Sequence, residues 1–349
     1  MLIDRRDDFA MGIRKTWHIL GISPLAYGTR HLASLREQGV MFVHGEITAL
    51  DPARRGLRVD RADVEADALV LALGAAHAVD AVPGLAEHGA DAWTLGTVDR
   101  THGAVDAFRG GRVLVGIFGA PYSCPPAPYE LALLLADRLE ERGIVAEVTV
   151  FGPAPITLPI LGAAGCATLD GRLVERGIPY LAGRTAAAVH PDAVEFTSGE
   201  REPFDLLLAI PPHRVPRVLV DAGLAAPDGW VKANPATLET DHAGVYAIGD
   251  CTSIGLSNGM ALPKAGALAE RAGEAVVERI AARLDGEEPD ATFDGVGACF
   301  IEMGSGEASM IRGDFFADPP LAILTEPTRE QRAEKERFES DRLARWFGA

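Results

Sequence analysis

The chain has 349 residues, 48% of them hydrophobic, and its formal net charge is −17. A chain of this length can bury a large core, so we expect a globular protein of two or three domains. The negative charge argues against nucleic acid as a partner, because binding to nucleic acid needs a basic surface. A small anionic substrate would have to be attracted by a local positive patch, and the rarity of lysine makes each lysine of interest.

The cysteines are Cys124, Cys166, Cys251 and Cys299, and they are too sparse and too widely spaced for a secreted disulfide scaffold. None lies in a C-x-x-C pair, so we predict no metal site. No run of residues is long and apolar enough to span a bilayer. We therefore expect a cytoplasmic protein, whose contact with the plasma membrane, if any, is peripheral.

Segments with the pattern of buried strands alternate with segments that have the pattern of helices. The opening residues, up to Asp4, have the pattern of the end of a strand, and a buried strand ends at Gly74. The elements expected after it are strand 112–119, helix 131–142, strand 146–151, helix 168–176, strand 204–210, strand 244–250, helix 263–284, strand 298–303 and a charged helix 328–347. This alternation is typical of an α/β protein with parallel sheets covered on both faces.

We predict an α/β fold with two Rossmann-like, doubly wound domains and a small C-terminal region. The first domain would comprise residues 1–110 and 236–286, the second residues 111–235, and the C-terminal region residues 287–349. No G-x-G-x-x-G loop, which holds the pyrophosphate in dinucleotide-binding domains, occurs in the chain. That loop would have to precede Leu2, so the first domain is expected to be truncated at its N-terminus.

An unusual turn follows the strand 112–119, where the sequence runs Cys-Pro-Pro-Ala-Pro-Tyr-Glu from Cys124 to Glu130. A turn between a strand and a helix normally holds a phosphate group when it is rich in glycine. Here the turn carries a cysteine just ahead of a helix, whose positive dipole end favours the thiolate and makes the sulfur more nucleophilic. The turn therefore indicates sulfur chemistry rather than binding of a pyridine nucleotide.

Three motifs occur in a fixed order along the chain. They are Cys124 to Glu130, Leu262-Pro-Lys264-Ala-Gly266, and Ala298-Cys299-Phe-Ile-Glu-Met-Gly304. Together with the more general strand 69–74 and the segment Ala247-Ile-Gly-Asp250, they resemble the sulfide:quinone oxidoreductase and flavocytochrome c sulfide dehydrogenase flavoproteins over nearly the whole chain. The resemblance implies FAD as cofactor, with hydrosulfide and a quinone as small-molecule substrates.

In that group two cysteines form the redox centre beside the flavin, and Cys124 and Cys299 stand in the matching motifs. Hydrosulfide would attack their disulfide, giving a persulfide on one sulfur and a thiolate on the other, and electrons would then pass through the flavin to a quinone. Glu130 would act as general acid or base, since burial raises the pKa of a carboxyl group. The alternatives are small buried thiols and a plain charge in the first turn of a helix.

The resemblance also assigns residues to the cofactor, FAD. Asp250 matches the aspartate that binds the ribityl chain, Gly249 permits close approach of the backbone, and Gly74 ends a strand that the flavoproteins share. Lys264 matches a lysine near the quinone and the pyrimidine edge of the flavin, where positive charge would stabilise the reduced ring. Asp4 lies where a dinucleotide fold accepts ribose hydroxyls. The alternatives are a turn after a strand for Asp250 and a surface lysine for Lys264.

If the chain has no preceding glycine loop, we expect weak or absent FAD binding and a destabilised first domain. Covalent flavin attachment in the cytochrome-linked relatives needs an N-terminal cysteine, and residues 9–28 contain none. The sequence therefore favours non-covalent FAD and a quinone acceptor. The last segment could be an amphipathic helix on a membrane or a charged helix packed on the protein, and its apolar residues are Phe338, Leu343, Trp346 and Phe347.

Two other functions stay open. A type II NADH:quinone dehydrogenase would need a nucleotide loop between Gly116 and Tyr129, which the prolines after Cys124 oppose. A truncated, non-catalytic remnant or a redox-sensing interaction protein would lack bound FAD. His213 could line the active site or lie on the surface, and Cys166 is expected to be structural. The sequence leaves open whether the protein forms a homo-oligomer.

Overall fold

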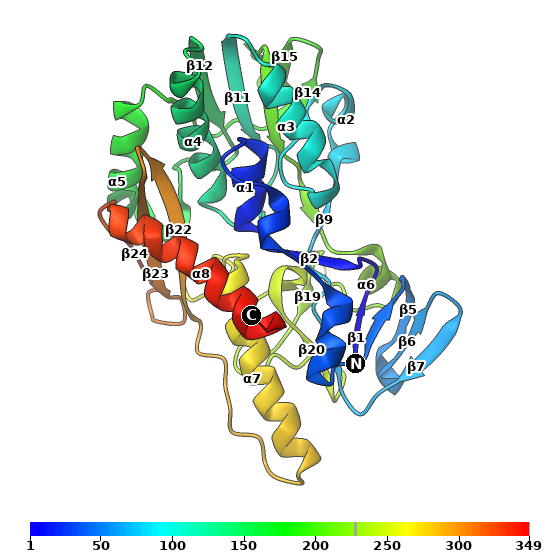
Figure 1. Cartoon of the computed structure of the whole chain (residues 1–349). Helices are drawn as coiled ribbons and strands as arrows, with labels where there is room; N and C mark the ends of the chain where they lie inside the picture. The colour runs from blue at the N-terminus through cyan, green and yellow to red at the C-terminus, as the bar shows by residue number, and fades with distance from the viewer. Residues whose placement is uncertain (227–228, 349) are drawn as a thin grey trace.

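The computed structural model describes residues 1–226 and 229–348. Its largest sheet, in the upper part of Figure 1, has five parallel strands in the order β10-β17-β11-β12-β13. They are β10 (Ala90–Asp91), β11 (Gly111–Ile117), β12 (Ala146–Phe151), β13 (Tyr180–Leu181) and β17 (Leu206–Ile210). Parallel strands need crossover connections. The helices in these crossovers are α3 (Val98–Ala107), α4 (Ala127–Glu141) and α5 (Gly162–Glu175).

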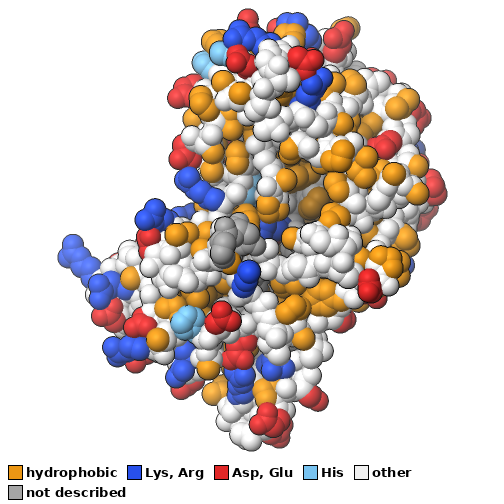
Figure 2. Space-filling model, turned by 180° about the vertical axis from the view of Figure 1, so that it is seen from behind, with side chains coloured by type: hydrophobic (Ala, Val, Ile, Leu, Met, Phe, Trp, Pro, Cys, Tyr) orange, Lys and Arg blue, Asp and Glu red, His pale blue; other side chains and the backbone are white. Residues whose placement is uncertain are grey.

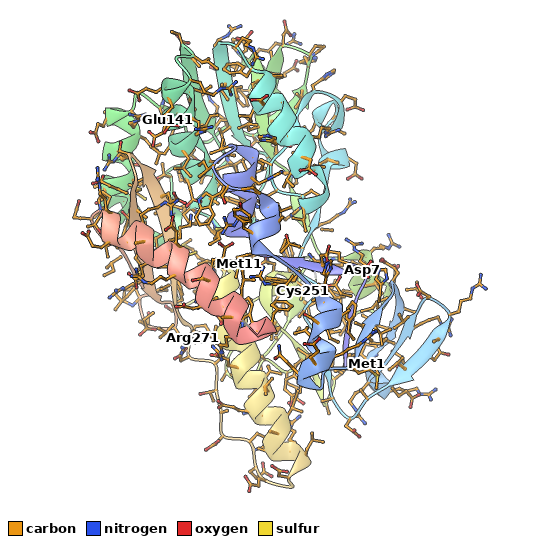
Figure 3. All side chains as sticks on the ribbon, viewed as in Figure 1. Met1, Asp7, Met11, Glu141, Cys251 and Arg271 are labelled. Atoms are coloured by element: carbon orange, nitrogen blue, oxygen red, sulfur yellow. The ribbon has the colours of Figure 1, made fainter. Side chains whose placement is uncertain are left out.

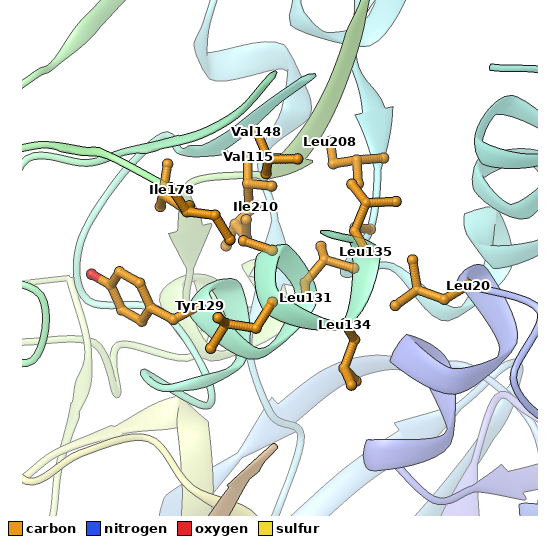
Figure 4. Packing of buried hydrophobic residues seen from close by; sticks show 14 of the residues in the cluster. Leu20, Val115, Tyr129, Leu131, Leu134, Leu135, Val148, Ile178, Leu208 and Ile210 are labelled. Atoms are coloured by element: carbon orange, nitrogen blue, oxygen red, sulfur yellow. The ribbon is translucent and has the colours of Figure 1, made fainter. Parts of the chain in front are cut away.

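Side chains of this sheet enter two separate cores, because successive residues of a strand point to opposite faces. On β11, Val113 and Val115 pack in one core with the three crossover helices, whereas Leu114 packs in another. Figure 4 shows Leu131 and Leu135 of α4 directed at the strands in the first core. A second layer lies on the other core and consists of α2 (Leu85–His88) and an antiparallel sheet of β14 (Ala186–Val189), β15 (Ala193–Phe196) and β16 (Arg201–Pro203).

The lower part of Figure 1 contains smaller sheets. β8 (Leu69–Leu71) pairs in parallel with β20 (Val245–Ala247), so segments far apart in the sequence lie side by side. Two antiparallel connecting strands, β9 (Ala76–His77) and β18 (His213–Arg214), link the upper and lower parts. The other elements up to residue 284 are β1 (Leu2–Asp4), β2 (Asp8–Ala10), α1 (Ile13–Ile19), β3 (Thr29–His31), β4 (Phe42–His44), β5 (Ile47–Asp51), β6 (Gly56–Val59), β7 (Ala62–Glu65), α6 (Arg217–Asp221), β19 (Val231–Lys232), β21 (Thr252–Ser253) and α7 (Gly266–Leu284).

The C-terminal residues form an antiparallel sheet and a long helix. The sheet consists of β22 (Val296–Gly304), β23 (Glu307–Asp314) and β24 (Leu321–Leu324), and helix α8 (Arg329–Phe347) packs against β23. Thr328 caps α8 by accepting a hydrogen bond from the backbone N–H of Gln331 at 3.1 Å. This sheet and helix lie next to α4, so the C-terminal segment returns to the turn that contains Cys124.

The apolar side chains that could have formed a membrane-facing stripe on α8 pack on the protein instead. Leu343 is buried, and the ring of Phe9 lies 5.7 Å from that of Trp346 and 5.5 Å from that of Phe347. Phe338 stacks edge-on against Phe300 of β22. Of the two expectations for this segment, the structure has the packed helix. Within residues 1–226 and 229–348, no helix has the length and apolar character needed to cross a bilayer.

The helix after Lys264 begins later than the sequence indicated. We predicted a start at Pro263, but α7 begins at Gly266. The reason is that the backbone of Lys264 is extended and forms a β-bridge with Ser123. Local pattern could not show this pairing, because the two residues lie far apart in the chain.

The division into residues 1–110 with 236–286, residues 111–235 and residues 287–349 stays a prediction. Two observations bear on its boundaries. β10 joins the large sheet through β17, although its residues fall in the first predicted domain. Val231 packs in the same core as Leu69 and Val245, although its position falls in the second.

Candidate active site

The motifs that contain Cys124, Lys264 and Cys299 meet at one place. The backbone N–H of Cys124 donates to the carbonyl oxygen of Lys264 at 2.7 Å, beside the bridge made by Ser123. Cys124 has a φ of 52°, in the left-handed region that residues with a Cβ rarely adopt. Its thiol lies beside that of Cys299 on β22, close enough for each sulfur to shift the pKa of the other. The structure therefore brings together the two thiols that the sequence singled out, and both are partly exposed and free.

Their interaction gives the two thiols different pKa values. The interaction with the Cys299 thiol, together with burial, raises the pKa of Cys124 well above its ordinary value. The same interaction lowers the pKa of Cys299, and the charge of Lys335 acts in the same direction. The sequence predicted the thiolate at Cys124 from the helix dipole. In the structure α4 begins only at Ala127, and the neighbouring sulfur has the larger effect, so Cys299 carries negative charge more readily.

Glu130 belongs to a buried charge cluster that we define as Glu130, Glu302, Arg332 and Lys335. The Nζ of Lys335 donates to Glu130 at 2.7 Å and to Glu302 at 2.9 Å. The backbone N–H of Glu302 donates to the same oxygen of Glu130 at 2.8 Å. Arg332 pairs with Glu302 at 2.6 Å, and Trp17 donates to Glu302 at 2.5 Å. Two carboxylates and two cations therefore balance each other inside the protein.

Burial and charge act against each other in this cluster. Burial raises the pKa of Glu130, and attraction to Lys335 limits the rise. For Lys335, burial lowers the pKa, but the two carboxylates have the larger combined effect, so the pKa is raised. The charge of Glu130 also raises the pKa of both thiols, which places its carboxylate beside the sulfur pair. Glu130 is thus placed to exchange a proton near Cys124 and Cys299.

A second group of ionisable side chains lies next to Ser123, and we call Lys15, His77 and His213 the Lys15 cluster. The Nζ of Lys15 donates to the carbonyl oxygen of Trp93 at 2.5 Å, and the indole N–H of Trp93 donates to the Ser123 hydroxyl at 2.9 Å. That hydroxyl lies 3.0 Å from Nε2 of His213, whose ring centroid is 4.6 Å from that of His77. The structure therefore places His213, which the sequence left open, beside the cysteine turn.

Lys15 is the member of the Lys15 cluster that can carry a positive charge while both imidazoles are neutral. Burial, together with the charge of Lys15, lowers the pKa of His77 to about 4. Burial and the neighbouring His77 lower the pKa of His213 to about 4 as well. Burial also lowers the pKa of Lys15, although Cys124, Asp91 and Asp250 oppose the shift. The imidazoles are therefore neutral at pH 7, so Lys15 is the member of this cluster that can supply a positive charge.

A cavity of about 360 Å³ lies between the end of β20 and the start of α7, bordered by Gly249, Asp250 and Lys264. The carboxylate of Asp250 makes no hydrogen bond or ion pair with residues 1–226 and 229–348, so its oxygens are open to donors from a ligand. Gly249 has a φ of 70°, and a Cβ there would lie 3.2 Å from that of Ala269 in α7. Only glycine allows both this conformation and this close packing.

These residues fit a flavin nucleotide. Gly74 has a φ of 65°, and a Cβ there would meet no atom within 4 Å, so the backbone borders open space. A partly apolar cavity with one carboxylate acceptor and a helix N-terminus suits a ligand that has an aromatic ring and hydroxyl groups. Asp250 would bind the hydroxyls, and Gly74, Gly249 and Lys264 would border the rest of the molecule.

Lys264 and Asp4 are held by partners of their own. Lys264 is 6% exposed, and its Nζ donates to the carbonyl oxygens of Asp250 at 2.7 Å and Thr252 at 2.8 Å, which makes the surface-lysine alternative wrong. Asp4 ends β1 as expected, but Arg6 donates to both of its oxygens. Although burial acts in the opposite direction, these bonds lower the pKa of Asp4. The assignment of Asp4 to ribose hydroxyls stays a prediction.

The remaining cysteines are buried away from the sulfur pair. The thiol of Cys166 contacts the carbonyl oxygen of Leu158 at 3.3 Å, in a fully buried position that fits the structural role expected for it. Cys251 follows Asp250, and burial raises its pKa to about 11. Figure 3 shows Cys251 inside the molecule, whereas Glu141 and Arg271 lie on helices at its surface.

A second cavity, of about 440 Å³, borders Cys299 and is almost entirely apolar. Its walls include Leu158, Ile160 and Ile311. Figure 2 shows hydrophobic side chains gathered around a hollow on the back face of the molecule. The cysteine pair therefore lies between an apolar cavity and a group of buried charges.

Sequence reasoning missed three residues of this site: Lys15, Glu302 and Lys335. Lys335 lies in a helix whose many charges suggested a solvent-exposed surface. Glu302 lay inside the third motif and was not singled out. The rarity of lysine was the available signal, because three of the four lysines lie around Cys124, whereas Lys232 is exposed.

Comparison with known proteins gives a family and several relatives for this chain. A family model described as pyridine nucleotide-disulphide oxidoreductase matches residues 9–273. The chain is 25% identical over 329 residues to the mitochondrial sulfide:quinone oxidoreductase of Mus musculus, which covers 89% of this chain and 71% of that protein. It is 27% identical over 231 residues to the alternative NAD(P)H-ubiquinone oxidoreductase C1 of Arabidopsis thaliana, and this match covers 57% of this chain and 42% of that protein.

A solved structure has a similar fold over almost the whole chain. The sulfide:quinone oxidoreductase from the hyperthermophilic bacterium Aquifex aeolicus gives a TM-score of 0.89 at 22% identity, covering 99% of this chain and 85% of that one. The predicted α/β fold is confirmed. The resemblance stated from the three motifs is confirmed as well.

Proposed function

This chain belongs to the pyridine nucleotide-disulphide oxidoreductase family of FAD-dependent enzymes, and on that premise we propose that it oxidises hydrosulfide through Cys124 and Cys299 and delivers the electrons to a quinone. The observation that carries this proposal is the proximity of the two thiols to each other and to the carboxylate of Glu130. Two sulfurs in contact can form a disulfide, which is the oxidised state that the reaction requires.

The unequal pKa values indicate which sulfur is attacked. In exchange reactions the sulfur with the lower pKa is the better leaving group. Hydrosulfide therefore attacks Cys124 and forms a new S–S bond, while the Cys124–Cys299 bond breaks and Cys299 leaves as the thiolate. The products are a persulfide on Cys124 and a thiolate on Cys299, which balance the charge of the incoming hydrosulfide. Glu130 then accepts the proton of the persulfide, and Lys335 stabilises the negative charges beside it.

Asp250, with Gly74 and Gly249, would hold the cofactor next to this pair. FAD, when bound, accepts the electron pair and passes it to the acceptor. Lys264 would keep positive charge near the ring, because its Nζ is fixed by two carbonyl oxygens. Asp4 would contribute to ribose binding.

An acceptor as apolar as a quinone needs an apolar surface near the site. The outer face of the C-terminal sheet exposes Val296, Leu321 and Ile323, which are 40%, 59% and 60% exposed. Val296 and Leu321 both pair with Asp314, so the side chains lie in register on one face. We propose this face as the place where a quinone approaches and where the protein makes peripheral contact with a membrane. The stacked rings of Phe300 and Phe338 border it.

The turn after β11 does not suit NADH. A pyrophosphate needs unpaired backbone N–H groups at the start of a helix. In α4 the N–H of Ala127 donates to the Cys124 carbonyl oxygen, and those of Tyr129 and Glu130 donate to Pro126. Pro128 has no N–H to offer. The four positions that would bind phosphate are thus already used, which favours sulfide over NADH as the electron donor.

The direct test follows the absorbance of flavin in the FAD-supplemented protein without oxygen. We expect sulfide to bleach the flavin and NADH to leave it oxidised, and a short-chain quinone to restore the absorbance. Bleaching by NADH alone would overturn the proposal in favour of an NADH dehydrogenase. Reoxidation by ferricyanide without reoxidation by the quinone would leave sulfide oxidation in place and remove the quinone.

A further inference from the structure

The Lys15 cluster has no part in the reaction as described so far. It nevertheless adjoins Cys124, because Ser123 connects it to the cysteine turn through hydrogen bonds to Trp93 and His213. Lys15 interacts electrostatically with Cys124 and also with Asp250, which borders the cofactor cavity. The side chain of Lys15 therefore lies near both the cysteine turn and the proposed flavin site.

Hydrogen bonds fix the wall around Lys15. The carbonyl oxygen of Pro211 lies 2.8 Å from Nδ1 of His213 and can only accept, so this nitrogen carries the proton. Nε2 of the neutral ring then accepts from the hydroxyl of Ser123. His77 is held by Thr94 at 2.8 Å. The wall is therefore made of neutral rings and hydroxyl groups, and Lys15 is its cation.

The charge of the whole protein makes this cation important. At a net charge of −17 the molecule repels small anions. An ammonium group near the target sulfur, in addition to that of Lys335, makes the local potential more positive at short range. The acidic group closest to competing for it is Asp91, which is 4% exposed and accepts hydrogen bonds from the backbone N–H groups of Trp93 and Thr94. Arg6 is a further positive group that acts on Lys15.

We propose that Lys15 is an anion-binding residue that draws a small anionic sulfur nucleophile to Cys124. The identity of that anion as hydrosulfide rests on the proposed function, but the anion site itself does not. One hydrogen bond, to Trp93, engages the Nζ of Lys15 in the structure, so further N–H groups of the ammonium can face a ligand. Lys15 thus acts on the approach of the substrate, whereas Glu130 acts on its proton.

The test compares alkylation of Cys124 by iodoacetate, which is anionic, with alkylation by iodoacetamide, which is neutral. The two rates are measured by mass spectrometry of the Cys124 peptide. Both reagents react with the thiolate, so the fraction of Cys124 that is ionised cancels in their ratio. We expect Lys15→Met to lower this ratio roughly fivefold, as for the loss of one partly screened charge. Lys15→Arg should keep the ratio, and so should Lys232→Met, which removes an exposed lysine.

The wild-type protein provides a second measurement that does not depend on a variant folding. Because the pKa of Lys15 is lowered, the preference for iodoacetate should fall as pH rises, and it should do so below the ordinary lysine pKa of about 10.4. An unchanged ratio in Lys15→Met, or a wild-type ratio that is constant between pH 7 and 10, would overturn the proposal. Neither measurement uses sulfide or flavin. If Lys15→Met lowers the ratio of the two alkylation rates but sulfide does not bleach the flavin, hydrosulfide is rejected as the anion and the anion site is retained.

Discussion

Lys335 and Lys15 both act on the cysteine turn, yet the protein shifts their pKa values in opposite directions. Lys335 is 1% exposed and lies between two carboxylates, whose attraction exceeds the effect of burial. Lys15 donates to a carbonyl oxygen, which offers no full charge in return, so desolvation prevails. The comparison indicates that the partner of a desolvated lysine, rather than desolvation alone, decides whether the charged form is favoured.

The two lysines therefore suit different tasks. The buried charge cluster around Lys335 is internally balanced and holds Glu130 and Glu302 in place beside Cys299. The Lys15 cluster carries one cation that is not paired with a carboxylate at hydrogen-bonding distance. A balanced cluster keeps a proton-exchanging group fixed, whereas a single cation attracts an anion from solution.

Removal of the sulfur atoms has the largest expected effect. It tests both lysine clusters at once, because both act on the cysteine turn. We expect Cys124→Ser and Cys299→Ser each to slow flavin reduction by sulfide at least about a thousandfold, because a hydroxyl can neither form the disulfide nor leave as a thiolate. Anaerobic stopped-flow absorbance measures this rate. Cys166→Ala, at a buried cysteine away from the pair, is the matched control and should keep it. A rate within tenfold of the wild type in either serine variant would remove that residue from the mechanism.

Removal of Lys335 tests whether the buried charge cluster depends on its cation. Lys335→Met leaves Glu130 and Glu302 with only Arg332 for compensation, so we expect the free energy of unfolding to fall by about 3–5 kcal/mol. Urea unfolding measures the change. Arg345→Met, which removes an exposed ion pair with Glu274, should cost less than about 1 kcal/mol.

A second substitution in the same cluster identifies the cause. Adding Glu130→Gln to Lys335→Met removes one of the uncompensated carboxylates, so the double variant should be more stable than Lys335→Met alone. If the double variant is less stable than the single one by the full cost of Glu130→Gln, the two residues are independent and the charge argument fails.

The histidines of the Lys15 cluster predict a loss of stability in acid. A histidine with a lowered pKa in the folded state contributes stability above its unfolded pKa, about 6.5, and that stability is lost as pH falls towards the folded value of about 4. We expect His77 and His213 together to account for about 2 kcal/mol of the loss between pH 7 and 4.5, after allowance for their partial exposure. Urea unfolding at both pH values should show a smaller loss in the double variant His77→Gln, His213→Gln. An equal loss in both proteins would mean that the imidazoles are already protonable in the folded state.

The sequence drew attention to the two cysteines that the structure brings together, but it gave little indication of the charges around them. Cys124 and Cys299 were found because each lies in a motif of unusual residues, and motifs are local. The ordinary location of Lys335, in a helix rich in charges, gave no such signal, because its burial depends on β23 packing against α8. Lys15 was missed for a similar reason, since its partners come from residues 91–93 and from the cysteine turn.

The same limit applies to pKa values. The helix dipole is a local property that can be read from the sequence, and it indicated a thiolate at Cys124. The interaction between Cys124 and Cys299 joins distant segments, and it reverses the expected order of the two thiol pKa values. The strands and helices of the large sheet were predicted better, because alternation of buried residues is itself local.

The smallest expected effect is the change in stability caused by Lys15→Met, and this change tests the comparison of the two lysines most directly. A lysine with a lowered pKa in the folded state costs stability below that pKa, and the cost disappears as pH rises to the unfolded value of about 10.4. Lys15→Met should therefore stabilise the protein at pH 7, with no difference from the wild type above pH 10.4. Urea unfolding across this range measures it. Lys335→Met should show the opposite sign at pH 7, because a raised lysine pKa contributes stability below the unfolded value. If both variants destabilise the protein equally at neutral pH, the partner of the lysine does not decide its charge.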